Sequence, residues 1–282
     1  MTVRIDKETR GRFGNKIFHY NTMMQLSNIL GKPPSTCDWF GMSHFNNICK
    51  FIPPTPGSSY EITCKELNDL SINQIKEIGD QYDNVSIHDY ALHGPFYKIC
   101  QEDPRKFLSL KPEYKANFNF DYPIAGIHIR GGDIRGGDGN NGREVHNSEF
   151  YIRAIESVLK IKPESKFFIA TDDPDISYEP FREVKKYLRE RNILINLNTS
   201  HNSKSYIGDF AALCEADTLI GGSSTFVMAA AIMGKHKQVI HSKKFFDQFL
   251  THEGAWYSSW GNQRFYKDSI LSKSKYYNIK VL

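Results

Sequence analysis

The second half of the chain alternates short apolar runs with longer amphipathic segments, and this alternation constrains the fold more than any other feature. The apolar runs lie at 124–129, 166–170, 193–196, 217–220 and 237–241, and helical patterns lie between them at 149–160, 179–191, 207–216 and 225–234. Nearly continuous apolar strands separated by helices are typical of a parallel sheet covered on both faces. We therefore predict a doubly wound α/β domain at 121–282.

The first half of the chain predicts fewer elements. A strand candidate at 3–6 precedes a helical pattern at 15–31, which Gly31 and two following prolines should end. A second helix is predicted at 66–79, and the rest of 35–100 lacks clear periodicity. The Pro-rich, polar stretch 104–123 is either a domain boundary or a long surface loop. We place a first domain at 1–120, since 282 residues suffice for two domains of typical size.

Composition excludes several classes of partner. The net charge is +4 and no long run of Lys or Arg occurs, so nucleic acid or a membrane surface has little electrostatic support as a partner. The five cysteines are widely spaced and form no CxxC pair, which argues against a disulfide framework or a zinc site. No apolar stretch has the length of a signal peptide or a membrane span. We expect a cytoplasmic protein without a membrane span.

Residues directly after the predicted strands are candidates for ligand binding, because doubly wound sheets bind ligands beyond the carboxyl ends of their strands. The sequence GGSSTF (221–226) places Ser223, Ser224 and Thr225 at a turn into a helix. Such a helix start offers free N–H groups, hydroxyls and a positive dipole end to a phosphate. Arg130, predicted at the same sheet edge, adds a planar fork of donors for phosphate oxygens. Together these residues predict a diphosphate pocket.

Each of these features also has a simpler structural interpretation. Serine before a helix is often only an N-cap, TDD (171–173) is often a turn, and a single Arg after a strand often forms an ordinary ion pair. Familiar catalytic and nucleotide motifs do not decide the matter: GxxxxGK[ST], GxSxG and HExxH are absent, and no GxGxxG follows a strand. Asp173 and Asp175 have the D-x-D spacing of many metal-dependent sugar transferases, which is a short match.

Four segments resemble one enzyme family. GIHIRGGD (126–133) resembles the H-x-R-R-x-D signature of α-1,2- and α-1,6-fucosyltransferases and protein O-fucosyltransferases, with His128, Arg130 and Asp133 in the matching positions. The segment 11–32 is similar to the G-x-G-N motif and helix of α-1,2-fucosyltransferases, 167–173 to their F-x-x-x-S-D-D segment, and 209–234 to their Asp-initiated helix, strand and Ser-Ser/Thr loop. Gly131 departs from the family pattern, because the signature has a second Arg there.

The resemblance implies a GT-B-type α/β fold. In it, a C-terminal Rossmann-like domain with a parallel sheet holds GDP-fucose, and an N-terminal Rossmann-like domain contributes acceptor contacts. Arg130 would bind the β-phosphate, and His128 and Asp209 would contact guanine or ribose. The other donor-site residues that the resemblance implies are Asp172, the loop residues Ser223, Ser224 and Thr225, and Gly14 and Asn15 from the opposite domain.

The implied reaction is inverting transfer of L-fucose from GDP-fucose to a hydroxyl of a glycan acceptor. A carboxylate must accept the hydroxyl proton, and Asp133, Asp138 and Glu144 are the candidates; Asp138 lies where the α-1,6 relatives carry their basic carboxylate. The catalytic residues are therefore predicted to be Arg130, Asp133 and Asp138, with no metal or other cofactor. Two alternatives remain open: a non-catalytic module that binds a GDP-sugar or glycan, and a transferase that uses another nucleotide sugar, with a metal at Asp173 and Asp175 if the donor is a UDP-sugar.

Overall fold

The computed structural model describes residues 1–5, 12–87, 96, 99–114, 121–131, 146–196, 206–222, 224–241 and 279–281. The described residues form two compact units whose boundary in the chain lies between Ser109 and Leu110. The assignment of an acceptor-side domain to 1–120 and a nucleotide-side domain to 121–282 remains a prediction. None of the helices in the described ranges is long and apolar enough to cross a membrane.

The first unit contains a four-stranded sheet in which every neighbouring pair is parallel. Its strand order is β2-β1-β5-β4, formed by β1 (Thr2–Ile5), β2 (Pro34–Thr36), β4 (Ser59–Ile62) and β5 (Asn84–Ile87). Short elements complete the described part of the chain up to Tyr114: η1 (Met42–His44), β3 (Phe45–Asn46), η2 (Pro104–Lys106), β6 (Ser109–Leu110) and η3 (Pro112–Tyr114).

The long helix α1 (Phe13–Leu30) confirms the helix predicted at 15–31, and Gly31 ends it in the left-handed conformation at φ 62°. The helix α1 is buried on nearly all sides, including the polar side chains of Asn21 and Gln25. Gln25 is satisfied there because its Oε1 accepts from the backbone N–H groups of Gln101 and Glu102, at 2.9 and 3.1 Å. A buried polar group that is hydrogen-bonded avoids the penalty of desolvation.

The single helix predicted at 66–79 is wrong, because the structure has two helices there, α2 (Cys64–Asp69) and α3 (Ile72–Gln81). Each begins with a capping box. Thr63 and Glu66 exchange hydrogen bonds at the start of α2, and Ser71 and Gln74 do the same at the start of α3. The second capping box starts a new helix in the middle of the predicted one.

The second unit contains a five-stranded parallel sheet, and its strands confirm the predicted doubly wound α/β class. The strands are β7 (Ile124–Ile129), β8 (Lys166–Thr171), β9 (Thr218–Gly221), β10 (Gln238–His241) and β11 (Ile279–Val281), in the order β11-β10-β9-β7-β8. The strand predicted at 193–196 is wrong, since only Leu194 forms an isolated bridge, with Phe167. The N–H of Ile193 instead bonds to Leu188 O, at the end of the preceding helix.

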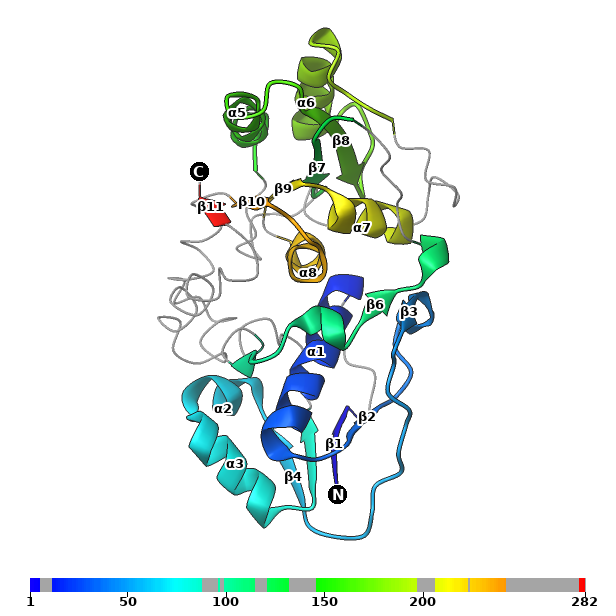
Figure 1. Cartoon of the computed structure of the whole chain (residues 1–282), viewed down its shortest axis with the longest axis vertical. Helices are drawn as coiled ribbons and strands as arrows, with labels where there is room; N and C mark the ends of the chain where they lie inside the picture. Colours follow the sequence, from blue (N-terminus) through cyan, green and yellow to red (C-terminus); the bar gives the residue numbers. More distant parts are fainter. Residues whose placement is uncertain are drawn as a thin grey trace. The chain divides into compact units, whose positions relative to one another are not determined.

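Helices cover both faces of this sheet, with α5 (Ser148–Leu159) and α6 (Glu179–Glu190) on one side and α7 (Tyr206–Glu215) and α8 (Thr225–Met233) on the other (Figure 1). Alternate residues of β7 face the two layers. Ile127 and Ile129 belong to the core under α5 and α6. Gly126 and His128 face the other layer: a Cβ on Gly126 would lie 2.9 Å from Leu213 of α7, and the His128 ring lies 5.3 Å from the ring of Phe226 in α8.

Candidate functional site

The strand order of the second unit defines where a ligand can bind. From β7 the chain passes to β8 on one side and to β9, β10 and β11 on the other, so the order reverses between β7 and β9. The register pairs His128 with Gly221, so both strands end at the same sheet edge. In open parallel sheets the crevice at this reversal, beyond the carboxyl ends of the strands, is the usual ligand site. Arg130 follows β7, and the start of α8 follows β9, at this edge.

Arg130 is held in place by contacts to both its side chain and its backbone. Its Nη1 lies 3.1 Å from Oδ2 of Asp172, and the other carboxylate oxygen of Asp172 accepts the N–H of Gly131 at 2.7 Å. The hydroxyl of Tyr178 donates to the Arg130 carbonyl at 2.5 Å, and the Tyr151 hydroxyl also bonds to the Arg130 backbone. The Arg130 side chain is 16% exposed. The guanidinium is thus oriented at the edge by Asp172, with an exposed part left for a ligand.

Replacing Tyr178 with phenylalanine tests this support. Tyr178 is buried at the N-cap of α6, and its hydroxyl is one of two that reach the Arg130 backbone. We expect Tyr178→Phe to lower the free energy of unfolding by about 1 kcal/mol, the net value of one hydrogen bond. If this sheet edge binds a nucleoside diphosphate, as the sequence predicts, the variant should also weaken GDP binding. Urea unfolding and calorimetry measure the two effects. Tyr187→Phe, which removes a hydroxyl bonded to Glu156, is the control; an equal loss of GDP affinity in both variants would contradict the assigned support.

Gly131, where the family signature has its second Arg, has no room for a side chain. A Cβ on Gly131 would lie 2.3 Å from the Cβ of Asp173, a distance at which one of the two backbones must shift. The close packing of the two loops that follow β7 and β8 therefore requires glycine at position 131. Of the two adjacent arginines in the signature, this chain has only the first, Arg130.

The two carboxylates of the D-x-D match form a turn. Asp175 accepts from the N–H and the hydroxyl of Ser177, at 2.8 and 2.7 Å, and Asp173 Oδ1 accepts from the Asp175 N–H at 3.4 Å. Such bonds are the usual role of Asp in turns. Within the described ranges, no three side chains of His, Cys, Asp or Glu are grouped so that they could hold a metal ion.

His128, near the carboxyl end of β7, is a neutral, buried imidazole. Burial lowers its pKa to about 4; the carboxylate of Asp172 opposes this shift, and the positive charge of Arg130 adds to it. Both charges therefore act on the ring. Its Nδ1 is buried without a hydrogen-bond partner among the described residues. A buried polar atom of this kind is costly unless something binds it, which makes His128 a candidate ligand contact.

Asp209 lies in the first turn of α7, the helix that covers the same sheet face as His128. Burial raises the pKa of its carboxyl to about 6. A carboxylate kept in a desolvated position at the expense of stability is typical of functional sites.

Replacing Asp209 with asparagine should therefore stabilise the fold at high pH. The folded carboxyl, with a pKa of about 6, binds its proton more tightly than the unfolded one, at 3.8, so the free energy of unfolding falls as pH rises through this interval. We expect Asp209→Asn to raise it by about 1–2 kcal/mol at pH 8, after a discount for partial exposure, and to change it little near pH 4. Urea unfolding at both pH values measures this.

Asp217 provides a control of opposite sign. Burial raises its pKa, but the Lys237 ammonium, 2.6 Å away, and the Ile124 N–H outweigh burial and lower the pKa overall. Its contribution to stability is present above the unfolded pKa and is lost as pH falls. Asp217→Asn should thus destabilise the protein at pH 8, and a destabilised Asp209→Asn at the same pH would contradict the assignment.

The start of α8 combines a cap with a tightly packed turn. Ser224 is the N-cap of α8, because its Oγ accepts a hydrogen bond from the Phe226 N–H at 3.2 Å. This confirms that the serine caps the helix. The capping bond uses the oxygen as acceptor and does not use the hydroxyl proton. Thr225 is the first helical residue. Ser223, Asp133, Asp138 and Glu144 lie outside the described residues.

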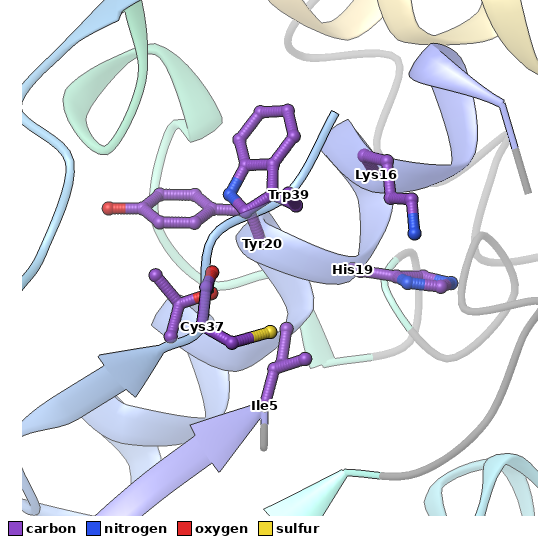
Figure 2. Close-up of a pocket in the computed structure, with 7 residues that line it drawn as sticks. Ile5, Lys16, His19, Tyr20, Cys37 and Trp39 are labelled. Atoms are coloured by element: carbon purple, nitrogen blue, oxygen red, sulfur yellow. The ribbon is translucent and has the colours of Figure 1, made fainter. Parts of the chain in front are cut away.

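Gly14 and Asn15 lie in the first turn of α1 in the first unit, which also contains a small pocket. The pocket lies at the carboxyl ends of β1 and β2 and is lined by Ile5, Lys16, His19, Tyr20, Thr36, Cys37 and Trp39 (Figure 2). Lys16, His19 and Tyr20 share one face of α1, and both Lys16 and His19 are buried. Sequence analysis missed this pocket, although the i, i+3, i+4 spacing next to two strand ends could have indicated it.

Sequence analysis also missed two supporting residues of the second unit. Tyr178 holds the Arg130 carbonyl from 48 positions away, and His146 contacts the Gly222 backbone from 76 positions away. No local pattern marks either residue, because a contact between distant segments leaves no periodicity in the sequence.

The sequence matches no protein-family model and no curated protein. The fold, with parallel sheets in both units and the order described above, is that of GT-B-like fucosyltransferases, and the predicted fold class is confirmed.

Three of the solved structures that are similar to this chain illustrate the match. POFUT1 in complex with GDP-fucose has a TM-score of 0.53 at 12% identity, over 83% of this chain and 94% of that chain. A FUT1 variant from Arabidopsis thaliana in complex with GDP has a TM-score of 0.53 at 13% identity, over 84% and 68%. The fucosyltransferase NodZ from Bradyrhizobium has a TM-score of 0.50 at 15% identity, over 83% and 93%. At these identities the similarity establishes the fold.

Proposed function

We propose that this protein is a glycosyltransferase that transfers L-fucose from GDP-fucose to a hydroxyl of a glycan acceptor. One observation carries the proposal: Arg130, held by Asp172, and the N-terminus of α8 lie at the same sheet edge, at the reversal of the strand order. A guanidinium and a helix start are both suited to a diphosphate. The fold supports GDP-fucose as donor, since it is shared with POFUT1 in complex with GDP-fucose and with an α-1,6-fucosyltransferase, NodZ, soaked with it.

We assign the donor-site residues the roles that the resemblance implies, and the geometry of the second unit supports them. Arg130 binds the β-phosphate and stabilises the charge that develops as GDP leaves, which is often the largest electrostatic contribution to catalysis. Ser224 and Thr225, with Ser223, bind the diphosphate at the start of α8. His128 and Asp209, from β7 and from the helix that covers its face, contact guanine or ribose. Asp172 orients Arg130, and Gly14 and Asn15 remain donor-site candidates on the resemblance of their segment to the fucosyltransferase motif alone.

The transfer inverts the anomeric centre. The acceptor oxygen attacks the anomeric carbon of β-linked fucose opposite the diphosphate, the bond from that carbon to the β-phosphate oxygen breaks, and the hydroxyl proton passes to a carboxylate. The product is an α-fucoside and GDP. Asp133 and Asp138 are the proposed bases. We assign no metal to this reaction.

The enzyme is proposed to be α-1,2-like, because three of the four segments are similar to α-1,2-fucosyltransferases in particular. Two other functions are tested alongside: binding of a GDP-sugar without transfer, and transfer from another nucleotide sugar.

Calorimetric titration with GDP, GDP-fucose, GDP-mannose and UDP, each with and without EDTA, followed by an assay of GDP release, tests the proposal. We expect GDP and GDP-fucose to bind whether or not EDTA is present, and GDP release to increase when a glycan acceptor is added. Binding without release at any acceptor would favour the non-catalytic module. EDTA-sensitive binding of UDP would favour the metal-dependent alternative, and absence of guanine-nucleotide binding would overturn the proposal.

A further inference from the structure

The turn that joins β9 to α8 contains two adjacent glycines, Gly221 and Gly222, called here the glycine pair. Neither has space for a side chain. A Cβ on Gly221 would lie 2.4 Å from Val227 Cγ2 of α8, and a Cβ on Gly222 would lie 1.9 Å from Cδ2 of His146. The glycine pair is therefore enclosed by α8 through Val227 and by the imidazole of His146.

His146 is itself held firmly. It is 8% exposed, and its ring packs at centroid distances of 5.1 Å from Phe150 and 6.4 Å from Tyr151, both in the first turn of α5. Asn147, the next residue, caps α5 through the Phe150 N–H. A ring fixed between aromatic side chains and a helix start has little rotational freedom, so it presents a rigid surface to the Gly222 backbone.

A second histidine holds the other side of the glycine pair. Nδ1 of His241, at the end of β10, lies 3.2 Å from the Gly221 carbonyl oxygen. Since a carbonyl only accepts, Nδ1 carries the proton. Burial, with a smaller contribution from the proximity of His146, lowers the pKa of His241 to about 4, although the contact with the Gly221 carbonyl opposes the shift. His241 therefore acts as a neutral donor, and the backbone of the glycine pair is restrained from both sides.

The consequence reaches α8. The Gly222 carbonyl accepts the Ser224 N–H at 3.0 Å, so the position of the glycine pair sets the N-cap of α8 and the direction of its first N–H groups. We infer that His146 is a positioning residue of the donor site: its imidazole fixes the glycine pair and thereby aims the N-terminus of α8 at the diphosphate. This inference rests on the proposed function, because the diphosphate is the ligand of that proposal.

The test compares His146→Ala, which removes the ring, with His146→Phe, which keeps a ring of similar shape without its nitrogens. We expect His146→Ala to weaken GDP binding on the order of tenfold to a hundredfold, as misplacement of a binding group by about 1 Å does, and His146→Phe to retain most of the affinity. With GDP-fucose, KM should rise in His146→Ala while kcat at saturation changes much less. Added imidazole should restore GDP binding to His146→Ala.

His236→Ala is the matched control, since His236 is an equally buried histidine of the same unit. Its ring lies 2.8 Å from the carbonyl oxygen of Ala216 and 3.0 Å from that of Ala230, which lies in α8 beyond the first turn and away from the glycine pair. We expect His236→Ala to lower thermal stability but leave the GDP affinity of the folded protein unchanged. An equal loss of GDP affinity in both variants would overturn the inference, as would unchanged GDP affinity in His146→Ala.

Amide hydrogen exchange separates this inference from the proposed function. A peptide that includes Gly221 and Gly222 should exchange faster in His146→Ala than in the unmodified protein, in the absence of any ligand. If the unmodified protein does not bind GDP, the proposed function is overturned, and so is the role of His146 in a donor site. If the unmodified protein binds GDP but the peptide exchanges at the same rate in the unmodified protein and in His146→Ala, the proposed function stands and the inference is overturned.

Discussion

Arg130→Ala should strongly reduce fucose transfer while the protein remains folded. We expect kcat to fall about a hundredfold to a thousandfold, the usual effect of removing one donor that stabilises developing charge, and GDP affinity to fall as well. The fold should persist because the Asp172 carboxylate, which loses its ion pair with Arg130 in this variant, is 32% exposed and still accepts the Gly131 N–H. GDP release, GDP calorimetry and thermal unfolding on the same preparation measure the three quantities.

Two further variants sharpen this result. Arg130→Lys keeps the positive charge but loses the planar fork of donors, so an intermediate loss is expected. Arg182→Ala removes a guanidinium whose side chain is 48% exposed in the same unit and whose ion pair with Glu183 lies within α6; it should leave GDP release unchanged. Normal turnover in Arg130→Ala would contradict the role of Arg130 on which the proposed function depends.

Gly131→Arg, which restores the second Arg of the family signature, should impair the protein. The Cβ that any such side chain requires would lie 2.3 Å from the Cβ of Asp173. Overpacking of this kind costs about 1–3 kcal/mol. The displaced loops also carry Arg130 and Asp172, so the loss of stability should be accompanied by a loss of GDP release. Urea unfolding and the GDP-release assay measure the two effects.

The double variant Gly131→Arg with Asp173→Gly provides the control, because it removes the Cβ against which the new side chain would collide. Asp173→Gly alone corrects for the loss of the turn contacts of Asp173, and the four proteins form a thermodynamic cycle. A stability coupling of at least about 1 kcal/mol in favour of the double variant is expected. A single Gly131→Arg variant that is as stable as the original and more active would contradict the packing argument.

The sequence alone determined the layers of the second unit and the edge on which its site lies. Hydrophobic periodicity is a local property, so the strands at 124–129 and 217–220 and the helices around them could be predicted from neighbouring residues. Because carboxyl ends of parallel strands share one edge, the order of the elements was enough to place Arg130 and Ser224 together. The break between α2 and α3 could have been predicted too, since Ser71 and Gln74 form a local capping box.

Only the tertiary structure decided how these residues are held. Whether 193–196 forms a strand depends on how far it pairs with β8, where the structure has a single bridge between Leu194 and Phe167, and the local pattern carries no information about that pairing. The space denied to Gly131 depends on Asp173, the orientation of Arg130 depends on Asp172 and Tyr178, and the enclosure of Gly222 depends on His146. Each is a contact between segments far apart in the sequence. Such contacts are fixed by packing at close distance after the chain has folded, so the sequence specified the chemical groups of the site and the fold set their geometry.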